Sequence, residues 1–133
     1  MKTICKRLQR GDDLLLCIES LAKSHNIQAG VILSGVGCVL RARVRDASGV
    51  NVREIPAHCE IVSLNGTVSA ARCHVHIALS DESLQTYGGH LLEGCIVNTT
   101  CELVIGVLDA WRFGAGFDEQ TGYEELRFLR DSE

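Results

Sequence analysis

The chain has 133 residues, of which 46% are hydrophobic and 23% charged, and its formal net charge at pH 7 is −4. This length suits one domain over residues 1–133 with a real hydrophobic core, and the composition excludes an intrinsically disordered chain. No apolar run approaches the roughly 18 residues of a membrane span, and residues 1–10 are too polar and basic for a signal peptide. We therefore expect a cytoplasmic protein that has no membrane partner.

The first two predicted elements are a strand and a helix. Thr3–Gln9 alternates as a strand, and Leu14–His25 has apolar residues at helical spacing. Asp12 or Asp13 suits the N-cap position, because a short carboxylate can accept from the free backbone N–H groups of the first turn. Asn26 suits the position after the last turn.

Two further strands follow the helix. Ile27–Leu40 is apolar and rich in glycine, which predicts a largely buried strand with a bulge or a close backbone approach. Arg41–Arg45 continues it in alternation to a turn at Asp46–Gly49, and Asn51–Ile55 returns as a short strand. A basic patch could form from Arg41, Arg43, Arg45 and Arg53, although alternating arginines are more often one solvated face.

The centre of the chain predicts a hairpin. Cys59–Leu64 and Thr67–Ala71 flank Asn65-Gly66, the pair that most strongly favours a two-residue turn. Arg72–Ser80 is the next predicted strand. If the turn forms at Asn65-Gly66, counting residues places Glu60 near Arg72.

The remaining residues predict more strands. Asp81–Gln85 is polar and suits a loop, whereas Leu91–Asn98 and Thr100–Trp111 are apolar enough for two strands. Tyr123–Leu129 can return as an edge strand after a turn. One helix followed by seven or eight strands joined by tight turns indicates an α+β fold with a mainly antiparallel sheet.

Three histidines could form a metal site. His74 and His76 are two apart on a predicted strand, so they share a face at a separation of roughly 6.5–7 Å. Gly88 and Gly89 could turn the chain sharply and bring His90 to the pair. Three imidazoles leave a tetrahedral zinc with one open position, as in catalytic or ligand-binding sites. The alternative is that these are half-buried, hydrogen-bonded histidines with no metal.

The seven cysteines include no C-x-x-C pair, which argues against a thiolate zinc site. Most lie inside apolar runs and are expected to be small core residues in a reducing compartment. Cys73 adjoins His74, but strand alternation points it to the opposite face. A thiol nucleophile is the less favoured alternative, because it requires an electropositive, partly exposed setting.

A family resemblance covers the chain from about Leu8 to Leu126. In order, it consists of Glu60-Ile-Val-Ser-Leu-Asn-Gly-Thr, His74-x-His76, Gly88-Gly-His-Leu, Gly94, Glu102 and Asp118-x-x-Thr-Gly-Tyr. These residues resemble the plants-and-prokaryotes conserved (PPC) domain. The resemblance implies an α+β fold with a curved, mostly antiparallel sheet of about seven strands and one main N-terminal helix, packed as a homotrimer. It also implies a metal, commonly zinc, on the matching His74, His76 and His90.

The chain departs from the plant members of this family at two points. Ala57-His-Cys-Glu-Ile-Val stands where the plant domain has Gly-Arg-Phe-Glu-Ile-Leu, and the chain has no Arg-Gly-Arg-Pro AT-hook. Bacterial stand-alone members are commonly described as predicted DNA-binding proteins. Proteins that bind duplex DNA gain much of their affinity from Lys and Arg side chains at the phosphates. An acidic chain such as this one is therefore not a typical DNA-binding protein.

Three functions therefore stay open. We favour a trimeric zinc-binding protein whose open metal position takes a small anionic or carbonyl ligand in a sensing or regulatory role. The second is a metal-dependent lyase or hydrolase, since the fold also resembles acetolactate decarboxylase, with Glu60 as the candidate catalytic partner and Asp81 as a weaker one. Glu60 could equally be a surface carboxylate. The third is a DNA-binding transcriptional regulator.

Overall fold

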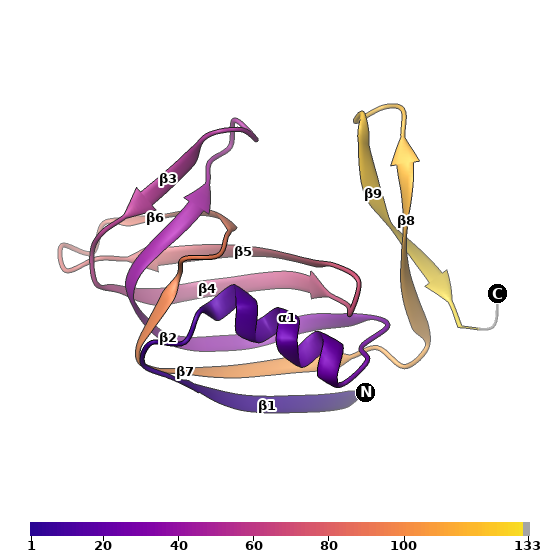
Figure 1. Ribbon diagram of the computed structural model, residues 1–133, viewed down its shortest axis with the longest axis horizontal. Coiled ribbons are helices and arrows are strands. Elements are labelled where there is room, and N and C mark those ends of the chain that lie inside the picture. Colours follow the sequence, from indigo (N-terminus) through magenta and orange to yellow (C-terminus); the bar gives the residue numbers. More distant parts are fainter. Residues whose placement is uncertain (132–133) are drawn as a thin grey trace.

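The computed structural model describes residues 1–131, which form one helix and nine strands (Figure 1). In chain order the elements are β1 (Lys2–Gln9), α1 (Leu14–Ser24), β2 (Gly30–Arg45), β3 (Val52–Ile55), β4 (Cys59–Val68), β5 (Cys73–Ser80), β6 (Thr86–Leu91), β7 (Ile96–Val107), β8 (Trp111–Asp118) and β9 (Tyr123–Arg130). The predicted fold class is confirmed: one N-terminal helix lies against a curved, antiparallel sheet. Within these residues, the single helix is too short to cross a membrane.

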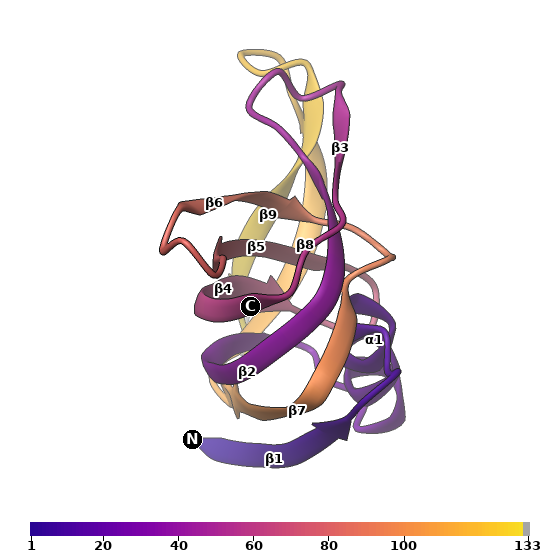
Figure 2. The ribbon, with the colours of Figure 1, turned by 90° about the vertical axis from the view of Figure 1, so that its left-hand side faces the viewer.

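Seven strands form the main sheet, in the order β1-β7-β2-β4-β5-β6, with β3 added beside β2. All of these pairings are antiparallel. β2 has 16 residues, and its far end also pairs with β6. This second pairing requires β2 to bend away from its first partners, and the bend is visible where the strand rises across the molecule (Figure 2).

The helix begins as the sequence predicts. Asp13 is the N-cap and accepts a hydrogen bond from the Leu16 backbone N–H at 3.1 Å. Leu14, Ile18 and Ala22 are fully buried on the face of α1 that packs against the sheet. Asn26 follows the helix with φ of 48°, a left-handed conformation that asparagine tolerates better than most residues.

The Asn65-Gly66 hairpin prediction is wrong. β4 runs straight through both residues to Val68, and the chain reverses only at Ser69–Arg72. A Cβ at Gly66 would lie 2.6 Å from the carbonyl oxygen of His74, so glycine serves close approach of β4 to β5. The Ser69 hydroxyl accepts from the backbone N–H of Arg72 at 3.1 Å and closes the true turn.

The Gly-Gly pair also differs from its predicted role. Gly88 and Gly89 lie inside β6 and do not turn the chain. A Cβ at Gly88 would collide with the backbone of Ile77 on β5, and one at Gly89 would lie 2.5 Å from the Arg45 carbonyl oxygen on β2. The glycines therefore let β6 lie closely between two strands, which brings His90 into register with its neighbours.

The C-terminal half contains two more differences. The predicted strands Leu91–Asn98 and Thr100–Trp111 are largely one strand, β7. Its pairing with β2 is irregular between Asn98 and Cys101, and Thr99 in this stretch has a left-handed backbone with φ of 49°. The predicted edge strand Tyr123–Leu129 does form, but it pairs with β8, a strand that the sequence did not indicate. β8 and β9 make a separate two-stranded hairpin that stands off the main sheet (Figure 1).

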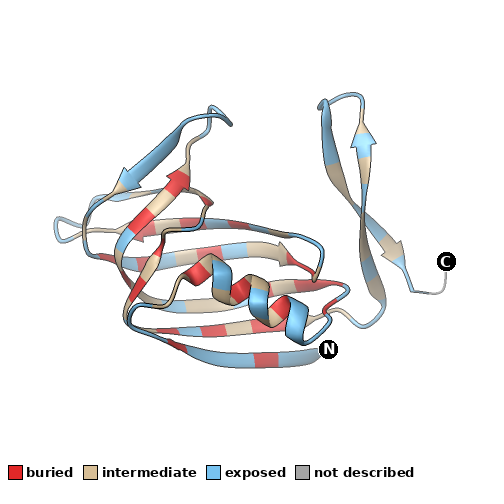
Figure 3. Cartoon of the chain, viewed as in Figure 1, coloured by how far each residue is buried: buried red, intermediate tan, exposed pale blue. Residues whose placement is uncertain are grey.

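Burial in β5 follows the strand period. Val75, Ile77 and Leu79 are almost completely buried, whereas His74 and His76 are exposed. Figure 3 shows the same alternation along the central strands, with much more exposure on the β8–β9 hairpin. The apolar face of β5 thus belongs to the core, which leaves the histidine face free for chemistry.

The close contact of β5 and β6 gives a test of the fold. Gly88→Ala is expected to lower the free energy of unfolding by roughly 1–3 kcal/mol, because the new methyl group must displace strand backbone. Gly114→Ala is the matched control, since its methyl group meets only the flexible end of Leu129 at 3.2 Å. Urea unfolding followed by circular dichroism measures both, and equal losses would contradict the close-approach explanation.

Candidate metal centre

The three predicted histidines lie together on the outer face of the sheet. One ring nitrogen from each of His74, His76 and His90 lies within 4.8 Å of the others. The ring centroids are 5.0 to 5.6 Å apart. His76 pairs directly with His90 across β5 and β6, so the strand register brings the third histidine to the other two.

This donor set fits a divalent metal. A tetrahedral zinc with bonds of about 2.0–2.1 Å requires ligand nitrogens about 3.3 Å apart, so the three rings need small side-chain rotations to reach it. His74 and His76 are exposed and His90 is partly exposed, which leaves room for those rotations. Such a metal would have an open fourth position on the solvent side.

The surroundings of His74 and His90 lower the pKa of both rings and so favour their neutral form. Burial lowers the pKa of His90 to about 4, and the positive charge of Arg45 acts in the same direction. Burial also lowers the pKa of His74, followed by the effect of neighbouring His76, while the carboxylate of Glu125 partly opposes the shift. Neutral imidazole is the form that binds metals, so at pH 7 protons are expected to compete little for His74 and His90.

Arg45 is a site residue that the sequence indicated only as part of a basic patch. It lies opposite His90 in the β2–β6 pairing, with a guanidinium nitrogen (Nη2) 3.3 Å from Nδ1 of His90. Its Nε is buried without a hydrogen-bond partner, and among the described residues it forms no ion pair. No local sequence signal could reveal this position, because it depends on pairing between strands 45 residues apart.

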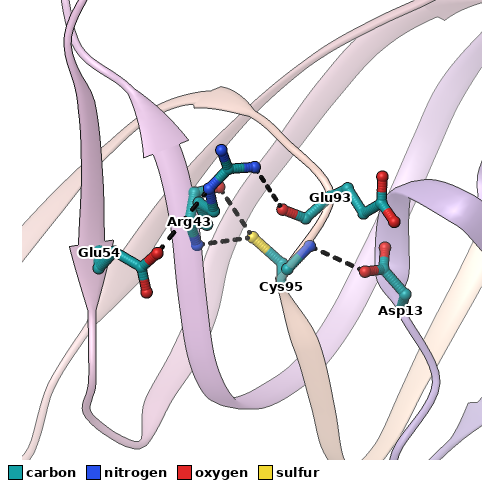
Figure 4. A network of polar contacts seen from close by, with 6 residues as sticks. Asp13, Arg43, Glu54, Glu93 and Cys95 are labelled. Carbon is teal, nitrogen blue, oxygen red and sulfur yellow. Dashed lines mark hydrogen bonds and ion pairs between the residues drawn. The ribbon is translucent and has the colours of Figure 1, made fainter.

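A polar network fixes the end of β2 against the segment that follows β6 (Figure 4). The backbone N–H of Arg43 donates to Sγ of Cys95 at 3.4 Å, and its guanidinium donates to the Glu93 carbonyl at 3.3 Å. Asp13, the helix cap, accepts from the Gly94 backbone at 2.8 Å. The network therefore links α1, β2 and the β6–β7 turn, and it holds the register that places Arg45 beside His90.

A hollow lies between the histidines and the β8–β9 hairpin. It is lined by residues from the β2–β3 turn, the start of β5 and the hairpin, among them Arg45, Arg72, His74, His90, Tyr123, Glu124 and Glu125. The Arg72 guanidinium donates to the backbone carbonyl of Glu124 at 3.3 Å and ties the hairpin to the sheet. Glu125 is thus an acidic group at the site that the sequence gave no reason to select.

The structure does not bring Glu60 to the histidines. Glu60 pairs with Ser80, whereas His76 pairs with Asn65, five residues along β4 and about 16 Å away by strand rise. The predicted neighbourhood of Glu60 and Arg72 is wrong because the chain turns later than Asn65-Gly66. Asp81 begins the β5–β6 loop, where it accepts from the backbone of Ser83 and from the hydroxyl of Tyr87.

The cysteines are consistent with small structural residues. All seven are free, and Cys59, Cys95 and Cys101 are buried. Burial raises the pKa of Cys101 to about 11 and also raises the pKa of Cys73, the neighbour of His74. A raised pKa disfavours the thiolate, so these two thiols lack the setting of a nucleophile.

Curated relatives match almost all of this chain but only part of their own length. The bifunctional protein GlmU from Synechococcus sp. strain JA-2-3B'a(2-13) is 38% identical over 120 residues, which are 90% of this chain and 19% of that protein. A second Synechococcus GlmU is 35% identical and is covered to 20%. The chain therefore spans about a fifth of the length of the curated relatives it matches.

Solved structures match nearly the whole fold. A hypothetical protein from Salmonella cholerae-suis is 30% identical with a TM-score of 0.94, over 98% of this chain and 94% of that one. A metal-containing protein from Archaeoglobus fulgidus is 32% identical with a TM-score of 0.76, over 98% and 93%. A "putative DNA binding protein" from Bacteroides thetaiotaomicron shares the fold, at 20% identity, a TM-score of 0.84, and 96% and 93% coverage.

The family assignment follows from a match over most of the chain. The family model described as the Plants and Prokaryotes Conserved (PCC) domain matches residues 1–109. This range contains the helix, the seven-stranded sheet and the three histidines, and it ends before the β8–β9 hairpin. The resemblance predicted from the histidine and glycine motifs is confirmed, and the chain belongs to the Plants and Prokaryotes Conserved (PCC) domain family.

Proposed function

We propose that this protein is a trimeric metal-binding domain in which His74, His76 and His90 hold one divalent ion, most suitably zinc. The single observation that carries the proposal is the convergence of three imidazoles on one outer face of the sheet, with one ring nitrogen of each within 4.8 Å of the others. Three protein ligands leave the fourth position open to a small ligand. The role that fits is sensing or regulation by that ligand.

The relatives support the proposal in part. The Archaeoglobus protein that shares this fold at 32% identity is named as metal-containing. Structural zinc sites are closed by four protein ligands, whereas three histidines would leave one position open. Arg45, Arg72 and Glu125 line the hollow beside that position.

The trimer is supported by exposed apolar surface. Phe117, Tyr123 and Phe128 on the β8–β9 hairpin are 59%, 70% and 62% exposed. A two-stranded hairpin is at best marginally stable alone in water, so these aromatic side chains need a surface to cover them. Two further copies of the chain supply that surface in our proposal, with the hairpin as the intersubunit contact.

Metal content tests the histidine site. Protein purified without a chelator or a His-tag is expected to contain about one zinc per chain by elemental analysis, and His74→Ala and His90→Ala are each expected to lose most of it. His58→Ala is the matched control, because His58 is exposed on a different part of the chain and should retain the metal. Equal metal in all four proteins, or none in the wild type, would contradict the site.

Sedimentation tests the assembly. The wild type is expected to sediment as three chains of 14.5 kDa, and Phe128→Asp should shift it toward the monomer because it places charge in the proposed contact. Leu84→Asp is the control, since Leu84 is 82% exposed in the β5–β6 loop, away from the hairpin. Sedimentation of the wild type as a monomer would contradict the trimer proposal.

A metal-dependent lyase or hydrolase is the second candidate. The observation that favours it is Glu125, which lines the same hollow as His74 and acts on its pKa, and so could move a proton at the open metal position. Glu60, the residue that the sequence favoured for this role, lies too far along β4 to serve. Metal, when bound, would polarise a carbonyl or activate a water molecule.

DNA binding ranks third. Two of the arginines that could form a basic patch are engaged with carboxylates, Arg43 with Glu54 at 3.8 Å and Arg53 with Asp46 at 3.6 Å. With a net charge of −4, we expect no mobility shift of a duplex at low salt with excess protein. A mobility shift that weakens steeply as the salt concentration rises would instead support DNA binding as the function.

A further inference from the structure

Arg45 is the charged group at the histidine cluster whose bonding is least complete. Among residues 1–131 its buried Nε has no hydrogen-bond partner, and the one polar contact of its guanidinium is Nη2 to Nδ1 of His90 at 3.3 Å. A buried donor without a partner costs free energy that is recovered when an acceptor arrives. The position of Arg45, beside the rings that would hold the metal, points to a ligand shared by the two.

Metal binding would release Arg45 from His90. A guanidinium can only donate, so Nδ1 of His90 must offer its lone pair to Arg45 in this contact. If Nε2 were to hold the metal, the proton of the neutral ring would lie on Nδ1, which could then not accept from Arg45. If Nδ1 binds the metal, its lone pair is used. In both cases the Arg45 guanidinium would lose the one side-chain acceptor that it has within the described part of the chain.

We propose that the ligand of this site is a small 2-oxo or 2-hydroxy carboxylate, whose carboxylate bridges the metal's open position and the freed guanidinium of Arg45. The inference rests on the proposed metal site and names the chemical class of its ligand. The planar fork of an arginine matches a carboxylate through two parallel hydrogen bonds. The adjacent oxygen would give the ligand a second donor atom for the metal, since a zinc site with three protein ligands can take up to two more.

The surrounding hollow agrees with a small anionic ligand. Besides Arg45 it is lined by Arg72, whose guanidinium donates to a backbone carbonyl and forms no ion pair among the described residues. Glu124 and Glu125, which belong to the hairpin, also line the hollow. A divalent metal and two arginines outweigh these two carboxylates in formal charge, so the loaded site attracts an anion.

The test is a titration of the cobalt-loaded protein, in which the visible absorption of Co²⁺ reports ligands at the metal. Pyruvate is expected to change the spectrum and to saturate, and methyl pyruvate, which keeps both oxygens but has no charge, should bind at least about tenfold more weakly. Arg45→Gln should raise the Kd for pyruvate about tenfold to a hundredfold and leave the Kd for methyl pyruvate unchanged. Arg45→Lys, which keeps the charge without the fork, should lie between.

Two controls keep this result separate from the metal proposal. Arg41→Gln alters an exposed arginine of the same strand and should bind pyruvate as the wild type does. Cobalt content, measured first by elemental analysis, should be equal in wild type, R41Q, R45K and R45Q. A wild type that takes up no cobalt would refute the metal site itself, before any ligand is added.

Three results would overturn the ligand assignment while leaving the metal site intact. The first is that R45Q binds pyruvate as tightly as the wild type. The second is that methyl pyruvate binds as tightly as pyruvate. The third is that orthophosphate, which chelates only through a strained four-membered ring, changes the spectrum at lower concentration than pyruvate.

Discussion

The pairing of β2 with β6 is the constraint on which the site depends. It joins the far end of a 16-residue strand to a short strand that also pairs with β5, so the sheet must curve. Val44 opposite Leu91 places both side chains in the core, and Arg45 opposite His90 then faces the histidine cluster. One register therefore sets the core packing and the composition of the site, because neighbouring strand residues point to opposite faces.

Close backbone approach makes this register possible. Side chains at positions 66, 88 and 89 would collide with or crowd the neighbouring strand, and glycine occupies all three. The same glycines looked like turn formers in the sequence, since Asn-Gly and Gly-Gly are strong turn signals. Tertiary packing decided between the two uses of glycine, and it moved the chain reversal from Asn65-Gly66 to Ser69–Arg72.

The candidate site combines three histidines with charged groups from distant parts of the chain. His74 and His76 come from β5 and His90 from β6, while Arg45 comes from β2 and Glu125 from the C-terminal hairpin. The strands β2, β5 and β6 present these side chains on one face and bury residues of the opposite face in the core, whereas the hairpin strand β9 has no buried residue. Chemistry and stability are thereby assigned to opposite faces, so substitutions on the histidine face should alter binding more than folding.

The sequence by itself determined the helix, its cap at Asp13, the strand period of residues 73–80 and the three histidines, because these signals are local and depend on spacing alone. It also carried the motifs that identified the family. Only the tertiary structure decided that Arg45 and Glu125 join the histidines and that Glu60 does not, since strand pairing across 45 residues leaves no trace in local pattern. A register is a long-range choice, and a shift of a few residues in one turn changes every partner along the strand.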